Sequence, residues 1–188
     1  LGNVIDPYVL TETYGLDQVR YFLLREVPFG NDGDFSNAAI IGRMNSELAN
    51  DYGNLAQRVL SMIHKNCEAR LPAPGDLTDE DHVLLAAVDG LLDTVREAFD
   101  RQAFHVGLEA IWAVVRQGNV YVDHQEPWKL RKTDPARMAT VLYVLAETIR
   151  ELAILTQPVM PDSSAQLLDL LSVPADARSF AAFGEVGR

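Results

Sequence analysis

Asn54 and Arg58 are two polar side chains four residues apart, and on a helix that spacing makes them neighbours on one face. Asn offers a donor and an acceptor together, and Arg offers a rigid fork of donors. Both groups therefore suit recognition of the hydrogen-bonding edge of a nucleotide base. Helical spacing puts Glu47, Ser61 and Lys65 on the same flank. The alternative interpretation is an ordinary solvated shoulder beside an apolar stripe.

A second signal lies about seventy residues further along, at Pro127-Trp128, and is followed by Lys129, Arg131 and Lys132. An indole gives an unpaired base a face on which to stack, and neighbouring cations suit the phosphates beside it. Trp128 is therefore a candidate stacking platform, and the three cations are candidate phosphate contacts. A Trp that follows Pro in a loop between helices is also a common packing anchor, so burial of the indole is the alternative.

Asn119 follows Val115 by four residues and so falls on the apolar stripe of a predicted helix. A buried Asn has to be hydrogen-bonded. Its partner is then either a nearby backbone group, or Asn119 orients Trp128 or the base-reading pair. Trp112, beside Ile111 within a regular helical pattern, is expected in the core.

Catalytic and metal-binding patterns are absent from the sequence. His64, His82, His105 and His124 show neither i,i+4 pairing nor HExxH, and no GxGxxG, GxxxxGK[ST] or GxSxG signature occurs. We therefore expect no catalytic residue, no metal and no cofactor in this chain. The single cysteine, Cys67, excludes an internal disulfide framework and fits a reducing, cytoplasmic location.

Composition restricts the possible partners. The 188 residues are 48% hydrophobic, which is enough for one good core, and they lack the ~18 consecutive apolar residues of a membrane span. The net charge of −11 argues against sequence-blind nucleic-acid binding. The cluster of Lys129, Arg131, Lys132 and Arg137 within nine positions leaves one favoured docking patch for a polyanion.

Residues 36–188 are predicted to form an antiparallel bundle of four or five helices, so the fold class is mainly α. Ser36 caps a first helix that fades near Asn66. Thr78 opens a second helix. A third begins near Phe104 and ends at the loop containing Pro127. Asp134-Pro135 starts a fourth helix, and a short fifth follows Pro161. The expected inward faces are Ile41, Met44, Leu48, Tyr52, Leu55, Val59 and Met62; Leu84, Val88, Leu91, Val95 and Phe99; Phe104, Leu108, Ile111, Val115 and Val122; Met138, Leu142, Leu145, Ile149 and Leu152; and Leu167, Leu168 and Leu171.

Residues 1–35 differ because glycines and prolines punctuate their short apolar runs. We expect a small irregular α/β segment that ends in the turn Gly30-Asn31-Asp32-Gly33-Asp34 and serves as a connector. The chain begins with Leu1, without a signal-peptide pattern, so we expect it to be part of a longer polypeptide.

Several segments resemble a known family. Leu1-Gly2-Asn3-Val4-Ile5-Asp6-Pro7, Tyr14-Gly15-Leu16-Asp17 and Arg20-Tyr21-Phe22-Leu23-Leu24-Arg25-Glu26 are similar to the stretch after the KMSKS signature of class I aminoacyl-tRNA synthetases. Three further segments narrow the resemblance to methionyl-tRNA synthetases: Gly30-Asn31-Asp32-Gly33-Asp34-Phe35-Ser36, Asn54 through Arg58, and Asn119 to Pro127-Trp128. The resemblance covers essentially the whole chain.

The resemblance implies a functional assignment. A whole enzyme of this family activates methionine with ATP and magnesium and esterifies it to tRNA(Met). Its catalytic Rossmann domain carries the HIGH and KMSKS signatures, which this sequence lacks, so the chain should be inactive alone. Residues 1–35 would form the stem-contact connector, and residues 36–188 the α-helical anticodon-binding domain. In the family a Trp stacks on the first base of the CAU anticodon while an Asn and an Arg read base edges. Trp128, Asn54 and Arg58 occupy the matching positions.

Two alternatives remain at this point. One is the equivalent domain of another class I synthetase, such as that for cysteine, leucine, isoleucine or valine. The other is a helical interaction module without an RNA role, which predicts a buried Trp128. The family commonly continues past the point where this chain stops, at Gly187-Arg188. Because no C-terminal extension offers a dimerisation domain, we expect a monomer.

Overall fold

The computed structural model describes residues 6–28, 30–31 and 35–184, and every regular element in those ranges is helical. The mainly-α prediction is therefore confirmed. Within the same ranges, no helix has both the length and the apolar character needed to cross a membrane.

Residues 1–35, the predicted connector, contain two helices, α1 (Pro7–Tyr14) and α2 (Leu16–Glu26). No strand is found among the described residues of this segment, so the expected α/β character is not observed there. The apolar run that suggested a strand lies in α2, where Tyr21 and Phe22 are buried and Leu23 is exposed. Periodicity cannot separate a strand from a buried helix in so short a run. Gly15, with φ of +94°, makes the sharp turn between α1 and α2. Residues 1–5 and 32–34, on which parts of the resemblance and of the predicted turn fall, lie outside the described residues.

The first predicted bundle helix runs through three consecutive segments: α3 (Asn37–Arg43), η1 (Met44–Gly53) and α4 (Asn54–Asn66). Ser36 caps it as expected, because its Oγ accepts a hydrogen bond from the Ala39 N–H at 3.1 Å. The middle segment, η1, is π-helical, which the sequence pattern did not predict. Upstream of it the buried face is displaced by one residue: Ile40 is fully buried, whereas Ile41, the residue predicted to face inward, is 46% exposed.

Six further helices complete the described chain: α5 (Asp79–Asp89), α6 (Leu91–Asp100), α7 (Phe104–Gln125), α8 (Pro127–Thr133), α9 (Pro135–Thr156) and α10 (Pro161–Leu170). Two short 3₁₀ turns follow, Ala175–Ala177 and Phe180–Ala182. The second predicted helix is divided at Gly90 into α5 and α6. The predicted cap of α9 is confirmed, since the Asp134 carboxylate accepts the Arg137 N–H at 3.0 Å.

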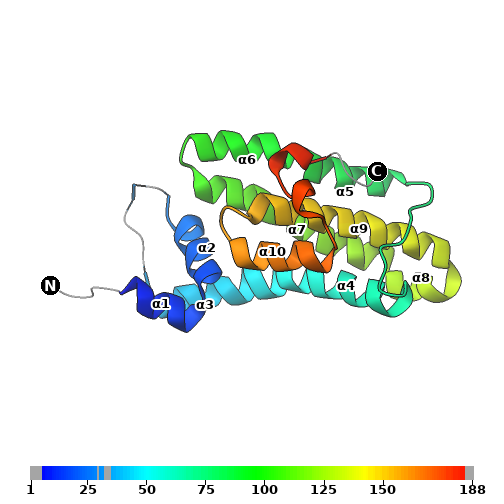
Figure 1. Ribbon diagram of the computed structural model, residues 1–188, viewed down its shortest axis with the longest axis horizontal. Helices are drawn as coiled ribbons and strands as arrows, with labels where there is room; N and C mark the ends of the chain where they lie inside the picture. The colour runs from blue at the N-terminus through cyan, green and yellow to red at the C-terminus, as the bar shows by residue number, and fades with distance from the viewer. Residues whose placement is uncertain (1–5, 29, 32–34, 185–188) are drawn as a thin grey trace.

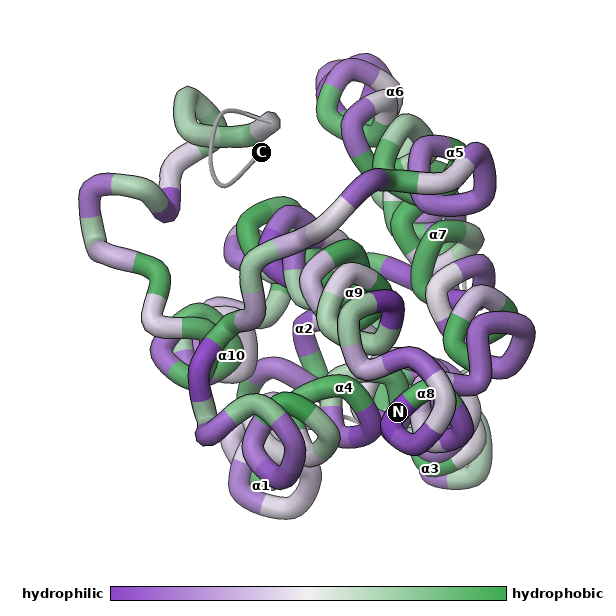
Figure 2. The backbone as a smooth tube through the Cα atoms, turned by 90° about the vertical axis from the view of Figure 1, so that its right-hand side faces the viewer, coloured by the Kyte–Doolittle hydropathy of each residue, from purple (hydrophilic) through white to green (hydrophobic). Residues whose placement is uncertain are grey.

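Helix α9 is the centre of the bundle. The end-on view in Figure 2 shows it surrounded by α4, α5, α7, α8 and α10. All of its residues from Thr140 to Thr156 are buried, including the charged Glu147, Arg150 and Glu151. Arg150 pairs with Glu147 at 2.6 Å and with Glu151 at 3.2 Å, so its positive charge lies beside both buried carboxylates. The five residues predicted to face inward from this helix are all buried: Met138, Leu142, Leu145, Ile149 and Leu152.

The connector docks on one end of the bundle through Glu47 and Asp17. Glu47 accepts hydrogen bonds from the Tyr21 hydroxyl and from Arg25 and Arg43. Asp17 accepts the Ser163 N–H at the start of α10, at 2.6 Å. Figure 1 shows α1 and α2 at one end of the elongated molecule and α8 at the other.

Candidate nucleic-acid interface

Arg58 and Trp128 meet at the end of the bundle opposite the connector. Arg58 comes from α4 and Trp128 from α8, and the guanidinium carbon lies 5.6 Å from the indole centroid, in cation–π contact. Arg58 Nη2 also donates to Asp123 Oδ1 at 2.6 Å. Trp128 remains 42% exposed, so its ring is not the buried packing anchor that the alternative required.

Trp128 lies on a helix and not in the predicted loop. Glu126 adopts a left-handed conformation with φ of 45°, which ends α7 and turns the chain directly into α8. Pro127 then occupies the first turn of α8, where its missing N–H costs nothing. Pro127 is buried and fixes the helix against the bundle, so Trp128 is presented from a rigid support.

Beside Trp128 and Arg58 the surface is hollowed by a cavity of about 300 Å³ between α4, α7, α8 and α9. Its floor is apolar and includes Val122 and Leu142, while Gln57, Ser61 and Lys65 supply polar atoms from α4. An aromatic wall, an apolar floor and polar groups beside them can receive a flat heterocycle and hydrogen-bond its edge.

Asn54 and Asn119 form a hydrogen-bonded pair one turn before Arg58. Asn54 Nδ2 donates to Asn119 Oδ1 at 3.4 Å, and Asn119 Nδ2 donates to the Asp51 carbonyl at 3.0 Å and to the Val115 carbonyl at 3.3 Å. Asn119 therefore bonds to backbone carbonyls, as one alternative expected, and it also contacts Asn54, as the other expected. Neither Asn54 nor Asn119 lines the cavity itself.

Three contacts between the first bundle helix and α7 share one register. Trp112 with Glu47, Asn119 with Asn54, and Asp123 with Arg58 are each separated by 65 residues. A constant separation means that the two helices run parallel, so a residue seven positions further along one helix finds its partner seven positions further along the other. The sequence spacing therefore carries Asn54 and Arg58 to one side of α7.

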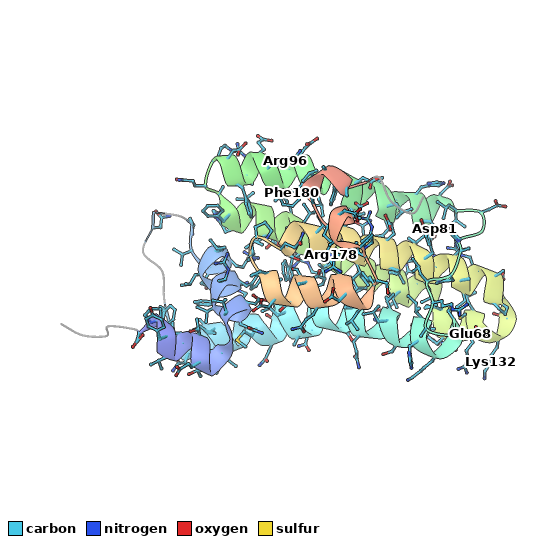
Figure 3. The ribbon with its side chains drawn as sticks, viewed as in Figure 1. Glu68, Asp81, Arg96, Lys132, Arg178 and Phe180 are labelled. Carbon is cyan, nitrogen blue, oxygen red and sulfur yellow. The ribbon has the colours of Figure 1, made fainter. Side chains whose placement is uncertain are left out.

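The members of the basic cluster lie in two different environments. Arg131 and Lys132 are exposed on α8, and Lys129 is exposed but pairs with Glu126 at 2.6 Å. Figure 3 shows Lys132 extending from the end of the molecule. Arg137, which the sequence grouped with these cations, instead turns inward and bonds Asp81 at 2.5 Å and 2.7 Å. The exposed cationic patch consequently consists of Lys129, Arg131 and Lys132.

Asp81 joins three helices of the bundle. Its carboxylate accepts hydrogen bonds from Arg137 of α9, from the Tyr121 hydroxyl of α7 at 2.5 Å, and from the Thr78 N–H at 2.9 Å. Burial by itself raises the pKa of Asp81, but these hydrogen bonds outweigh it and lower the pKa to about 2. The ion pair supports the ends of α7 and α9 that carry α8.

Sequence reasoning missed Asp123 and misplaced Glu47. Asp123 follows Asn119 by four residues, so the i,i+4 rule that selected Asn54 and Arg58 could also have selected it. Glu47 was placed on the flank of Asn54 by α-helical spacing, yet it is buried among connector residues, because the intervening π turn changes the angular register. Among the residues that the structure describes, no group of acidic, His or Cys side chains could hold a metal ion.

Comparison with known proteins places these features in a family. The family model described as the anticodon-binding domain of methionyl tRNA ligase matches residues 71–182, and the model for class I tRNA synthetases (M) matches residues 1–60. The methionine–tRNA ligase of Brucella suis is 59% identical over 181 residues, which cover 96% of this chain and 35% of that protein. That of Rhizobium meliloti is 58% identical and covers 100% of this chain and 36% of that protein.

Solved structures agree with the sequence relatives. Mycobacterium tuberculosis methionyl-tRNA synthetase in complex with methionyl-adenylate superposes with a TM-score of 0.96 at 54% identity, over 98% of this chain and 37% of that one. The chain thus spans about a third of the length of its relatives. The matches separate it from the other class I synthetases considered above. The chain belongs to the methionyl-tRNA ligase family and includes that family's anticodon-binding domain.

Proposed function

We propose that this chain is the tRNA-reading part of a methionine–tRNA ligase. It binds the anticodon stem-loop of tRNA(Met) and recognises CAU, so that the catalytic Rossmann domain of the same polypeptide charges that tRNA with methionine. The whole enzyme uses ATP and magnesium for this reaction, in the cytoplasm. The proposal rests on the family membership and on one geometric observation, the contact of Arg58 with the exposed Trp128 beside a cavity.

In this proposal Trp128 stacks on the first anticodon base, and Arg58 and Asn54 read base edges. A half-exposed indole on a rigid helix offers a stacking face without ordering a flexible loop. Arg58 has five N–H donors, and its bond to Asp123 uses one of them, so the guanidinium retains donors for a base. Asn119 holds the Asn54 amide, and Pro127 holds α8.

Lys129, Arg131 and Lys132 contact phosphates of the stem-loop. They project from the helix that carries Trp128, so a backbone bound to them keeps a base close to the indole. The chain otherwise has a strong negative balance, with a net charge of −11, which repels RNA docked elsewhere. Phosphate contacts of this kind position the RNA but do not select its sequence.

We propose that residues 1–35 connect this domain to the catalytic domain and contact the tRNA stem. Helices α1 and α2 lie at the end of the molecule opposite α8 (Figure 1). That arrangement suits a segment that joins the anticodon reader to a second domain.

A binding titration tests the proposal. The chain is titrated with an RNA stem-loop bearing CAU and, at the same salt concentration, with one whose first anticodon base is changed to U. We expect a loss of about 1–3 kcal/mol for the changed base. Equal binding of both RNAs would show a non-selective RNA contact. Binding of neither, with the helical fold verified, would favour a protein-interaction module or a need for the catalytic domain.

A further inference from the structure

The helix that carries Asn54 and Arg58 contains the π-helical segment η1 immediately before Asn54. In an α-helix each N–H bonds the carbonyl four residues back, whereas in a π-helix the partner lies five residues back. The Asn54 N–H still makes the π-type bond to the Ala49 carbonyl, five residues back, and shares this N–H with the Asp51 carbonyl. Such turns are rare and occur frequently at functional sites. The side chain of Asn54 therefore leaves the helix at the exit of an unusual turn.

Gly53 is required by the geometry of this turn. A Cβ atom at position 53 would lie 2.9 Å from the Leu48 carbonyl oxygen, which is a backbone atom five residues back and cannot rotate away. Gly42, in α3 of the same continuous helix, has no atom within 4 Å of its would-be Cβ. The π turn therefore leaves no room for a side chain at position 53, whereas position 42 can accept one.

Two side chains of α7 hold the π turn from outside. Trp112 Nε1 donates to the Glu47 carbonyl at 3.0 Å, and Asn119 Nδ2 donates to the Asp51 carbonyl at 3.0 Å. Trp112 and Asn119 are seven residues apart, two turns of α7, so they hydrogen-bond two different carbonyls of the π turn. Trp112 is fully buried, and Asn119 bonds the Asn54 amide as well.

The π turn also determines which side chains of the helix face the core before and after it. Upstream of it Ile40 is buried in place of Ile41, a displacement of one residue from the α-helical expectation. Downstream, Leu55 and Val59 point into the core as predicted, which leaves Asn54 and Arg58 beside α7. The turn therefore lets one helix satisfy the connector contacts of Glu47 at one end and present the polar pair correctly at the other.

We propose that the π turn Met44–Gly53 sets the angle at which Asn54 and Arg58 face an anticodon base, and that Gly53 and Asn119 are positioning residues for base selection. The inference rests on the proposed function. Neither residue needs to touch RNA. Gly53 permits the turn, and Asn119 couples the Asp51 carbonyl to the Asn54 amide.

Gly53→Ala tests this role, with Gly42→Ala as the matched control in the same helix. Binding is measured with the CAU stem-loop and with the stem-loop whose first base is U, and the quenching of Trp128 fluorescence by bound RNA is recorded. We expect Gly53→Ala to reduce the discrimination between the two RNAs by about tenfold, at retained Trp128 quenching. Gly42→Ala should keep the wild-type discrimination.

Asn119→Asp is a second variant that tests the positioning role if Gly53→Ala impairs folding. The replacement keeps the size of the side chain and the acceptor for Asn54 but removes the donor to the Asp51 and Val115 carbonyls. We expect it to reduce discrimination as Gly53→Ala does, with the thermal unfolding midpoint measured alongside.

Two results would overturn the inference: unchanged discrimination in folded Gly53→Ala and Asn119→Asp proteins, or an equal loss of affinity for both RNAs. If the wild-type chain itself binds CAU but does not discriminate, the base-reading function fails, and the positioning role falls with it. Because that result appears in the wild type and the other two appear only in variants, the two failures are distinguishable.

Discussion

Arg58 contacts a carboxylate and an aromatic ring at once, and both contacts come from elements outside its own helix. Asp123 of α7 receives one N–H at 2.6 Å, and the ring of Trp128 lies 5.6 Å from the guanidinium carbon. The planar, weakly hydrated guanidinium suits both partners, which a Lys ammonium would not. In the proposed function these contacts hold the arginine near its working geometry before RNA arrives.

Replacement of Trp128 by Ala should remove about 1–3 kcal/mol of RNA binding free energy, because the stacking face is lost. The fold should survive, since the indole is 42% exposed. Titration with the CAU stem-loop and thermal unfolding measure the two effects. The contrasting variant is Trp112→Ala, which removes a fully buried indole and should destabilise the fold by about 3–5 kcal/mol. A strong loss of stability in Trp128→Ala would instead assign the exposed indole to packing.

Arg58→Ala should weaken recognition of the first anticodon base by about 1–3 kcal/mol. The stability cost should be small, because the partner carboxylate of Asp123 is 62% exposed and can return to water. Arg116→Ala is a suitable control, since that arginine also pairs on α7, with Glu109. Comparison of stem-loops that differ only in the first base gives the result. A uniform loss across all anticodons would identify Arg58 as a phosphate contact.

At the scale of elements, the sequence predicted those helices whose ends carry local signals. Ser36 and Asp134 cap helices that begin where expected, and Pro161 starts α10. The sequence did not predict η1, because apolar spacing of three and four residues assumes hydrogen bonds four residues back. It also missed α8, a helix of seven residues that is too short to show a period.

The site was predictable in its residue types but not in its full geometry. Spacing alone put Asn54 beside Arg58, and the family resemblance linked both to Trp128. The partners of Asn54 and Arg58 on α7 depend on the register between α4 and α7, which no local pattern encodes. For Asn119 the sequence left two kinds of partner open, a backbone group or the Asn54–Arg58 pair, and Asp123 was not identified at all.

The ion pair between Asp81 and Arg137 should make bundle stability depend on acidic pH. The folded state lowers the pKa of Asp81 from 3.8 to about 2, so its contribution is fully present above pH 4 and is lost as the pH falls toward 2. We expect the free energy of unfolding to drop by about 2 kcal/mol more in the wild type than in Asp81→Asn across that range. Denaturant unfolding at several pH values measures it. Asp93→Asn, at a side chain that is 97% exposed, should leave the pH profile unchanged.

At the scale of the whole molecule, the charge distribution is uneven. Exposed cations gather on α8, at the end opposite the connector, while the chain as a whole carries a net charge of −11. In the proposed function this polarity orients the RNA before any base is read. Association should therefore be sensitive to ionic strength even though the protein is acidic.

Lys132→Ala should weaken binding equally for matched and mismatched stem-loops and should reduce the slope of log affinity against log salt by about 1. Arg96→Ala is the control, because it changes the charge by the same amount on α6, away from Lys132 in Figure 3. It should change neither the affinity nor the salt slope. Titrations at three or more salt concentrations give both slopes. A change of discrimination in Lys132→Ala would show that this lysine contacts a base.

The burial of every residue of α9 from Thr140 to Thr156 has a consequence for how this domain can be altered. A helix that is covered on every side has no face on which residues can be exchanged freely, so randomised libraries should be depleted of functional members wherever they touch positions 140–156. Helices α4 and α8 each keep an outward face, and the polar pair and the indole lie there. New anticodon preferences can therefore be sought by diversifying these outward positions while the central helix is left untouched.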